Sequence, residues 1–263
     1  MKNKLMVVCV IAAVGMLATS AHAAFDVGVT PDVIFGSGNA NGGFTVAQAD
    51  GVELGLRAKL RHNASGLPEN AFNSNGDGTY SFDAGVAPFQ STSTAVWSFE
   101  WSINSNVDGS GGSLNAYTYA LRIDSDATAG TNFLAFDPIN ASNPGANDLV
   151  LWDHAIGTNN TGNGGGTSAG DATQYASLIG SNNVAQNSWK PHWFIPLFDP
   201  TVDGTYTFEL EALDGGVTIA MTSMDVIVGA GAAVPEPGSL LIWGLLGIGC
   251  AAMGVVRRRR RTA

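Results

Sequence analysis

The chain has 263 residues, of which 45% are hydrophobic and only 13% are charged, and its formal net charge is −10. This length accommodates one or two domains, and the apolar fraction is ample for a packed core, which excludes wholesale disorder. An acidic chain repels phosphate backbones, so general nucleic-acid binding is excluded as a main activity. Two cysteines cannot build the disulfide scaffold of a small secreted domain.

Residues 1–23 have the three parts of a secretory signal peptide. Lys2 and Lys4 provide the positive start, and the apolar run that follows ends at Leu17, too short to span a bilayer comfortably. Ala21-His22-Ala23 then has the small-residue pattern of a signal cleavage site. We therefore predict that the secretion translocon exports the chain and that the mature protein begins at Ala24.

A second hydrophobic segment, residues 238–256, contains no charge. As a helix it would be about 28 Å long, close to the ~30 Å hydrocarbon core of a bilayer. Five basic residues follow it directly: Arg257, Arg258, Arg259, Arg260 and Arg261. Because basic residues beside a span stay in the cytoplasm, we predict a transmembrane helix with an arginine anchor inside and the rest of the chain outside.

The segment before this span consists of Val234, Pro235, Glu236 and Pro237. Its two prolines impose an extended, non-helical backbone at the membrane surface. Over residues 234–263, the order Val-Pro-Glu-Pro, apolar helix, arginine cluster and chain end resembles the PEP-CTERM sorting signal.

This resemblance implies how the chain is transported. Proteins with the signal are exported by Gram-negative bacteria that make exopolysaccharide, and an exosortase, a membrane protease-transpeptidase, processes them near Pro-Glu-Pro. The resemblance therefore implies a single-pass inner-membrane intermediate, followed by release to the cell surface or extracellular matrix.

The exported body, residues 24–233, differs from the average of the whole chain. Five basic side chains against 21 acidic ones give it a net charge of −16. Both cysteines lie outside it, Cys9 in the signal peptide and Cys250 in the predicted span. The body must therefore reach its stability without a disulfide.

The body has the alternating pattern of β-strands rather than the period of helices. In residues 52–60 the apolar side chains alternate with Glu53, Arg57 and Lys59, which predicts a half-buried strand with its charged face toward water. Clusters of Gly, Asn, Asp and Ser separate such runs, as turns require. The residues expected to face the core are Val52, Leu54, Leu56, Ala58, Leu60, Trp97, Phe99, Trp101, Ile103, Tyr117, Tyr119, Leu121, Ile123, Tyr206, Phe208, Leu210, Ala212, Val217, Ile219 and Met221. The pattern predicts an all-β domain, a β-sandwich or jelly roll, with a short helix possible only at residues 173–179.

One metal-binding hypothesis arises from a polar loop. Asn73, Asn75 and Asp77 offer oxygen donors at the first, third and fifth positions of an EF-type loop, and Gly78 occupies the sixth. Ala84 stands where the closing acid belongs, and a plain Asn-Gly-Asp-Gly turn is the alternative. Asp124 and Asp126 are a second calcium candidate.

Carbohydrate binding is a further hypothesis because five tryptophans lie in the body. Trp97 and Trp101 share a face with other core residues, whereas Trp152 and Trp193 lie near loops and are the better candidates for stacking on a sugar.

The sequence contains only weak motifs for a catalytic site. Ser168 fits the Gly-x-Ser-x-Gly spelling of a hydrolase nucleophile, but a flexible Asn-Gly loop stands where a buried strand should precede it. The histidines of the body, His62, His154 and His192, lack the spacing of a zinc site and are expected on the surface or in strands. We therefore expect no enzyme and no catalytic residue, but a structural or adhesive protein of exopolysaccharide or biofilm. A lectin-like module and a secreted polysaccharide hydrolase remain alternatives.

Overall fold

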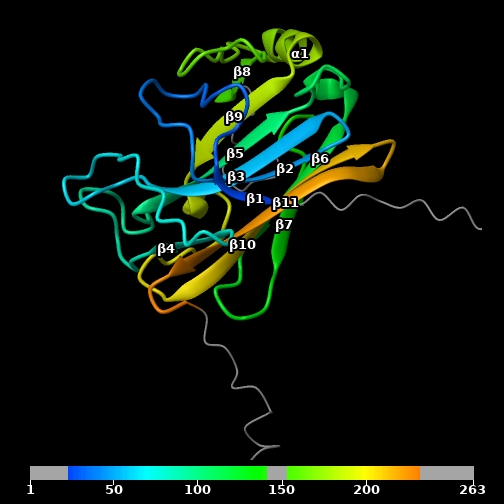
Figure 1. Cartoon of the computed structure of the whole chain (residues 1–263). Coiled ribbons are helices and arrows are strands. Elements are labelled where there is room, and N and C mark those ends of the chain that lie inside the picture. The colour runs from blue at the N-terminus through cyan, green and yellow to red at the C-terminus, as the bar shows by residue number, and fades with distance from the viewer. Residues whose placement is uncertain (1–22, 141–152, 232–263) are drawn as a thin grey trace, which may run out of the picture.

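The computed structural model describes residues 23–140 and 153–231, and this part of the chain is mostly β-structure in two sheets (Figure 1). The first strand, β1, begins at Ala24, the residue predicted to start the mature protein. The predicted all-β class is therefore confirmed for the body.

The first sheet has six strands in the order β1-β2-β3-β5-β9-β8, and every neighbouring pair is antiparallel. Its strands are β1 (Ala24–Val27), β2 (Phe44–Ala49), β3 (Val52–Leu60), β5 (Trp97–Asn104), β9 (Val184–Trp189) and β8 (Ala155–Gly157). The edges are the short strands β1 and β8.

The second sheet has five strands in the order β4-β11-β10-β6-β7. Its strands are β4 (Thr79–Phe82), β11 (Val217–Val228), β10 (Gly204–Asp214), β6 (Thr118–Asp124) and β7 (Phe133–Phe136). All pairs are antiparallel except β4 with β11, which is parallel. The long β10–β11 hairpin is its centre.

The two sheets pack face to face around one aromatic core. Phe99 of β5 meets Phe208 of β10 with ring centroids 4.7 Å apart, and Trp97 meets the same ring edge-on at 6.2 Å. These side chains are almost fully buried, and each contributes about 1.5–3 kcal/mol through the burial of apolar surface. The alternation in residues 97–103 and 206–212 therefore predicted the inward faces correctly.

The prediction that the charged face of β3 is exposed to water is wrong, because the side chains of that face are buried. Glu53, Arg57 and Lys59 are 2%, 0% and 2% exposed. The segment of residues 28–43 lies over this face, so close that a Cβ on Gly55 would stand 2.6 Å from Val29 Cγ1. Alternation identified the two faces of β3, but it could not show that a distant loop covers the polar one.

The predicted inward face of β11 is also wrong in part. Val217 and Met221, predicted to face the core, are 67% and 40% exposed, whereas Met224 and Val226 are buried. A register shift after Ala212 explains the difference, because it moves the buried face to the even-numbered residues of β11. The apolar residues on both faces of this strand hid that choice.

Three short helical segments complete the described chain: η1 (Leu114–Ala116), α1 (Ala172–Ser181) and η3 (Pro191–Trp193). The short helix expected at residues 173–179 is confirmed as α1. Asp171 begins it, since its side chain accepts a hydrogen bond from the Gln174 backbone N–H at 2.8 Å.

Candidate functional site

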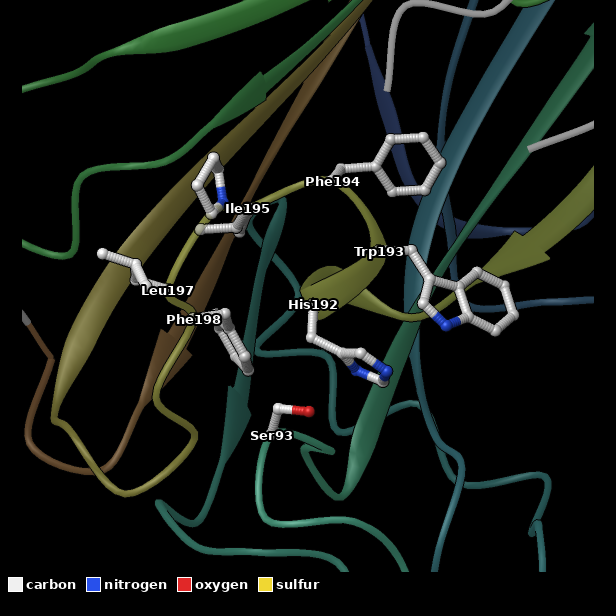
Figure 2. Close-up of a pocket in the computed structure, with 8 residues that line it drawn as sticks. Ser93, His192, Trp193, Phe194, Ile195, Leu197 and Phe198 are labelled. Carbon is white, nitrogen blue, oxygen red and sulfur yellow. The ribbon is translucent and has the colours of Figure 1, made fainter. Parts of the chain in front are cut away.

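A surface pocket of about 240 Å³ lies where the chain leaves β9 and passes through η3. It is lined by Ser93, His192, Trp193, Phe194, Ile195, Pro196, Leu197 and Phe198. Figure 2 shows the His192 imidazole directed toward Ser93, with the Trp193 indole on the far side of His192. The pocket therefore combines an apolar wall with a hydroxyl, an imidazole and an indole.

Pro191 explains the local path of the chain. It occupies the first turn of η3, where a missing N–H costs nothing, and its fixed φ favours the turn. Phe194 then turns inward and stacks on Phe136 at 5.6 Å between ring centroids. This anchor leaves the preceding His192 and Trp193 at the surface, half-buried.

The electrostatics of the pocket favour a neutral imidazole. Burial lowers the pKa of His192, and the neighbouring Lys190 ammonium lowers it further. The His192 Nδ1 atom is buried and has no hydrogen-bond partner within the described part of the chain. Lys190 Nζ also lies 5.8 Å from the centre of the Trp193 ring, a cation–π geometry that adds a cation to the rim.

A neighbouring hollow of about 410 Å³ shares Ser93, Leu197 and Phe198 with this pocket. Leu197 is fully exposed at 101% and has a φ of 56°. Phe89, in the loop that also carries Ser93, is 86% exposed with a φ of 63°. Left-handed backbone at a bulky residue costs about 1–3 kcal/mol and concentrates at binding sites. Leu197, which lines both hollows, therefore marks them as a candidate contact surface.

Of the two tryptophans predicted for sugar stacking, Trp193 lies at this pocket and Trp152 falls outside the described residues. Trp97 and Trp101 are in the core, as predicted, and Trp189 joins them there. Sequence reasoning missed the apolar wall, because an isolated Phe, Ile or Leu in a loop has no periodic signal.

The predicted calcium loop has the hydrogen bonds of a turn. Asp77 Oδ1 accepts from both the N–H and the hydroxyl of Thr79, at 3.0 and 2.7 Å, which lowers the pKa of Asp77. The Asn75 amide donates to Thr79 and Ser81 hydroxyls, and Asn73 has a left-handed φ of 53°. Calcium at this loop remains a prediction.

The second calcium candidate is placed differently. Asp124 is 1% exposed, and its Oδ1 accepts the N–H groups of Asp126 and Asn132 at 3.0 and 2.8 Å. Its Oδ2 is buried without a hydrogen-bond partner among the described residues. Residues 23–140 and 153–231 contain no group of three or more His, Cys, Asp or Glu side chains that could hold a metal.

His154 corrects the expectation of a surface or strand histidine. It is completely buried, with its ring 4.9 Å from Trp101 and 5.5 Å from Trp189 between centroids. Its Nε2 lies 2.7 Å from the Pro138 carbonyl, which can only accept, so Nε2 donates. The Asn187 amide lies 2.9 Å from Nδ1, and Asp153 Oδ1 lies 3.4 Å from the same atom. Its role is in packing.

The Gly-x-Ser-x-Gly spelling places Ser168 on an exposed loop. Ser168 lies in the loop before α1, and its hydroxyl donates to the Asp153 carbonyl at 3.3 Å. The loop that precedes it agrees with the expectation of a Gly-Ser loop.

Val234, Pro235, Glu236 and Pro237, the span 238–256 and the arginine tail lie outside the described residues. Within the described residues, none of the helices has the length and apolar composition needed to span a membrane. The family model for the PEP-CTERM protein-sorting motif matches residues 233–261. No curated protein matches the chain.

The chain thus carries a PEP-CTERM protein-sorting motif, as its sequence predicted. This motif is that of an exported protein with a membrane-anchored intermediate, and its processing partner is an exosortase.

Proposed function

We propose that the exported body is a structural or adhesive protein of exopolysaccharide or biofilm, retained at the cell surface or in the matrix. The observation that carries this proposal is the sorting motif at residues 233–261, which follows directly on a folded β-body. The body ends its last strand, β11, at Val228, so processing near Pro235 leaves the fold intact.

Fractionation of the producing cells tests this proposal. We expect the full-length chain, after processing, to co-purify with the exopolysaccharide and to resist washing in buffer. A matched chain that ends after Ala233 lacks the sorting segment and is expected in the free medium. Equal amounts of both chains in the polysaccharide fraction would contradict retention through sorting.

We also propose, as a second candidate, that the body binds carbohydrate at the pocket around Trp193. Support comes from its combination of an indole, a neutral imidazole and a hydroxyl beside exposed apolar residues. Small-molecule sites take this form, with an apolar surface for contact and a few polar groups for orientation.

A glycan array with the exported protein identifies a ligand, and titration of that glycan measures the contribution of Trp193. We expect Trp193→Ala to weaken binding about tenfold or more, because loss of ~1.4 kcal/mol of contact is a factor of ten. Val217→Ala, an exposed apolar change on β11, is the matched control and should bind normally. Absence of binding to any glycan, or full binding by a folded Trp193→Ala variant, would contradict this candidate. Release of reducing ends during the titration would favour a hydrolase instead.

A further inference from the structure

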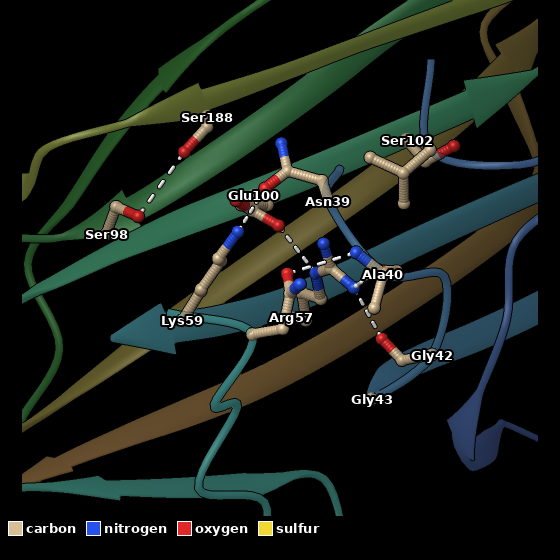
Figure 3. A network of polar contacts seen from close by, with 12 residues as sticks. Asn39, Ala40, Gly42, Gly43, Arg57, Lys59, Ser98, Glu100, Ser102 and Ser188 are labelled. Carbon is tan, nitrogen blue, oxygen red and sulfur yellow. Dashed lines mark hydrogen bonds and ion pairs between the residues drawn. The ribbon is translucent and has the colours of Figure 1, made fainter. Parts of the chain in front are cut away.

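A buried polar cluster lies between the first sheet and the covering segment of residues 28–43. Arg57 and Lys59 extend from the outer face of β3, and Glu100 extends from the same face of β5 (Figure 3). Arg57 pairs with Glu100 through its Nε at 2.5 Å, with both side chains essentially unexposed. Asn39 of the covering segment completes the cluster by accepting a hydrogen bond from Lys59 Nζ.

Arg57 holds the covering segment in place. Its Nη1 donates to the carbonyls of Ala40 and Gly42 at 2.9 and 2.6 Å, one and three residues beyond Asn39. The rings of Phe44 and Phe72 lie over its guanidinium at 4.1 and 4.2 Å. The stretch of chain that carries Asn39 is therefore fixed against β3.

The Asn39 side chain is itself oriented. Its Nδ2 donates to the Phe35 carbonyl at 2.9 Å, which directs its carbonyl group toward Lys59. Its backbone carbonyl accepts from the Asn163 amide at 2.6 Å. An amine and a primary amide are thus held in contact, and such fixed placement raises the rate of reaction between two groups by orders of magnitude.

Glu100 is the acidic neighbour of Lys59 on this face of the sheet. In the β3–β5 register Lys59 lies opposite Ser98, so Glu100 is its diagonal neighbour on the same face, within reach of long side chains. Figure 3 draws the ion pair from Glu100 to Arg57, and the charge of Glu100 also acts on Lys59 through space. Burial lowers the pKa of Lys59, which favours the neutral, nucleophilic amine, and Glu100 partly opposes that shift.

We propose that Lys59 and Asn39 react to form an intramolecular isopeptide bond, with Glu100 as the proton carrier. Lys59 Nζ gives one proton to Glu100, and the free amine attacks Asn39 Cγ to form the Nζ–Cγ bond. The Cγ–Nδ2 bond then breaks as a second proton passes from Nζ to Nδ2. Nδ2 leaves as ammonia and takes up the proton from Glu100, so that one ammonium and one amide become a secondary amide and an ammonium ion.

An isopeptide bond would stabilise a body that contains no cysteine. Both cysteines lie outside residues 24–233, so the exported body has no disulfide of its own to strengthen it. An amide between residues 39 and 59 would tie the covering segment to β3 and close a loop over the buried charges. It would supply the covalent strap that exported domains obtain from cysteine.

Tandem mass spectrometry of a tryptic digest of the exported full-length chain tests the proposal. We expect trypsin to leave Lys59 uncut and residues 58–61 to be joined to the peptide that contains Asn39 and ends at Arg57. The joined species should weigh one ammonia less than its two parts. Recovery of an unmodified Asn39 peptide, together with cleavage after Lys59, would overturn the proposal and leave a hydrogen bond only.

Variants separate the bond from the roles of its neighbours. Lys59→Arg keeps the charge and should abolish the joined peptide, whereas Lys190→Arg changes the other lysine of the body and should leave it. Glu100→Gln should abolish or strongly slow the joining in a chain that remains folded by circular dichroism. A joined peptide in Glu100→Gln would overturn the role of Glu100, and the digest of the unmutated chain decides the bond even if a variant fails to fold.

Discussion

At the scale of single residues, two arginines of the body form ion pairs in opposite environments. Arg57 and its partner Glu100 are completely buried, while Arg122 is 30% exposed and bridges Glu209 and Glu211 at 3.3 and 2.6 Å. Removing one member of a buried pair leaves an uncompensated charge in the interior. The Arg122 cluster is partly exposed, with Arg122 and Glu209 in contact with water and Glu211 buried, so water and salt screen it in part.

The substitution Arg57→Ala is therefore expected to lower the free energy of unfolding by about 3–5 kcal/mol. Arg122→Ala, the comparison, should lower it by less, because Arg122 and Glu209 remain in contact with water and salt. Urea denaturation of each exported variant, followed by tryptophan fluorescence, measures both. Equal losses from the two substitutions would contradict the buried ion pair.

His62 should make the stability of the body depend on pH. Burial lowers the pKa of His62 below 6.5, and the cations Lys190 and Arg61 lower it further. Its Nε2 is buried without a partner among the described residues. Because the unfolded chain takes up this proton more readily, the free energy of unfolding should fall as the pH drops from 6.5 through the lower pKa of the folded protein.

Thermal melts at pH 7 and pH 5 test this dependence. The unmutated chain should melt at a lower temperature at pH 5, and His62→Gln, which cannot take up a proton, should lose less. An identical decrease in both chains would show that other groups cause the acid sensitivity.

At the scale of elements, sequence patterns predicted strands better than they predicted surroundings. The sequence Asp-Gly-Thr-Tyr occurs twice, at residues 77–80 and 203–206. It leads into β4 and β10, where Tyr80 and Tyr206 are buried. Strict alternation placed Trp97, Phe99 and Trp101 in the core because sheet side chains have a period of two. That period says nothing about which distant segment covers the second face, so the burial of Lys59 could not be foreseen.

The α1 helix allows a test of one local signal. Asp171→Ala removes the side chain that caps Gln174 and should lower the free energy of unfolding by about 1 kcal/mol. Asp171→Asn keeps an oxygen at the same position and should cost much less. Hydrogen exchange at the first turn of α1 measures the effect, and equal protection in all three chains would argue against the cap.

At the scale of the whole molecule, the sequence predicted part of the candidate site and missed the part that depends on the fold. A surface tryptophan near Lys190 and His192 could be read from the loop residues around it. The wall of Ile195, Leu197 and Phe198 depends on how residues 194–198 turn back on the sheets, and no short-range pattern encodes that path. Transport was the clearest prediction, because a sorting segment is a linear signal that works by order and composition rather than by fold.

The two ends of the chain explain why its average properties mislead. A net charge of −10 conceals a body of −16 and a basic tail, and the two cysteines belong to the hydrophobic segments. The body is therefore an acidic, cysteine-free β-domain, and the sorting motif at residues 233–261 follows it in the sequence.

The most direct test of this account is the size of the chain in cells that contain an exosortase. In the unmutated chain, an immunoblot against the body should show a processed form that has lost the arginine tail. Glu236→Ala should abolish that form and leave the longer chain in the membrane, while Glu69→Ala, an exposed glutamate of the body, should be processed normally. An unchanged ratio of long to processed forms in Glu236→Ala would contradict sorting through the Pro-Glu-Pro segment.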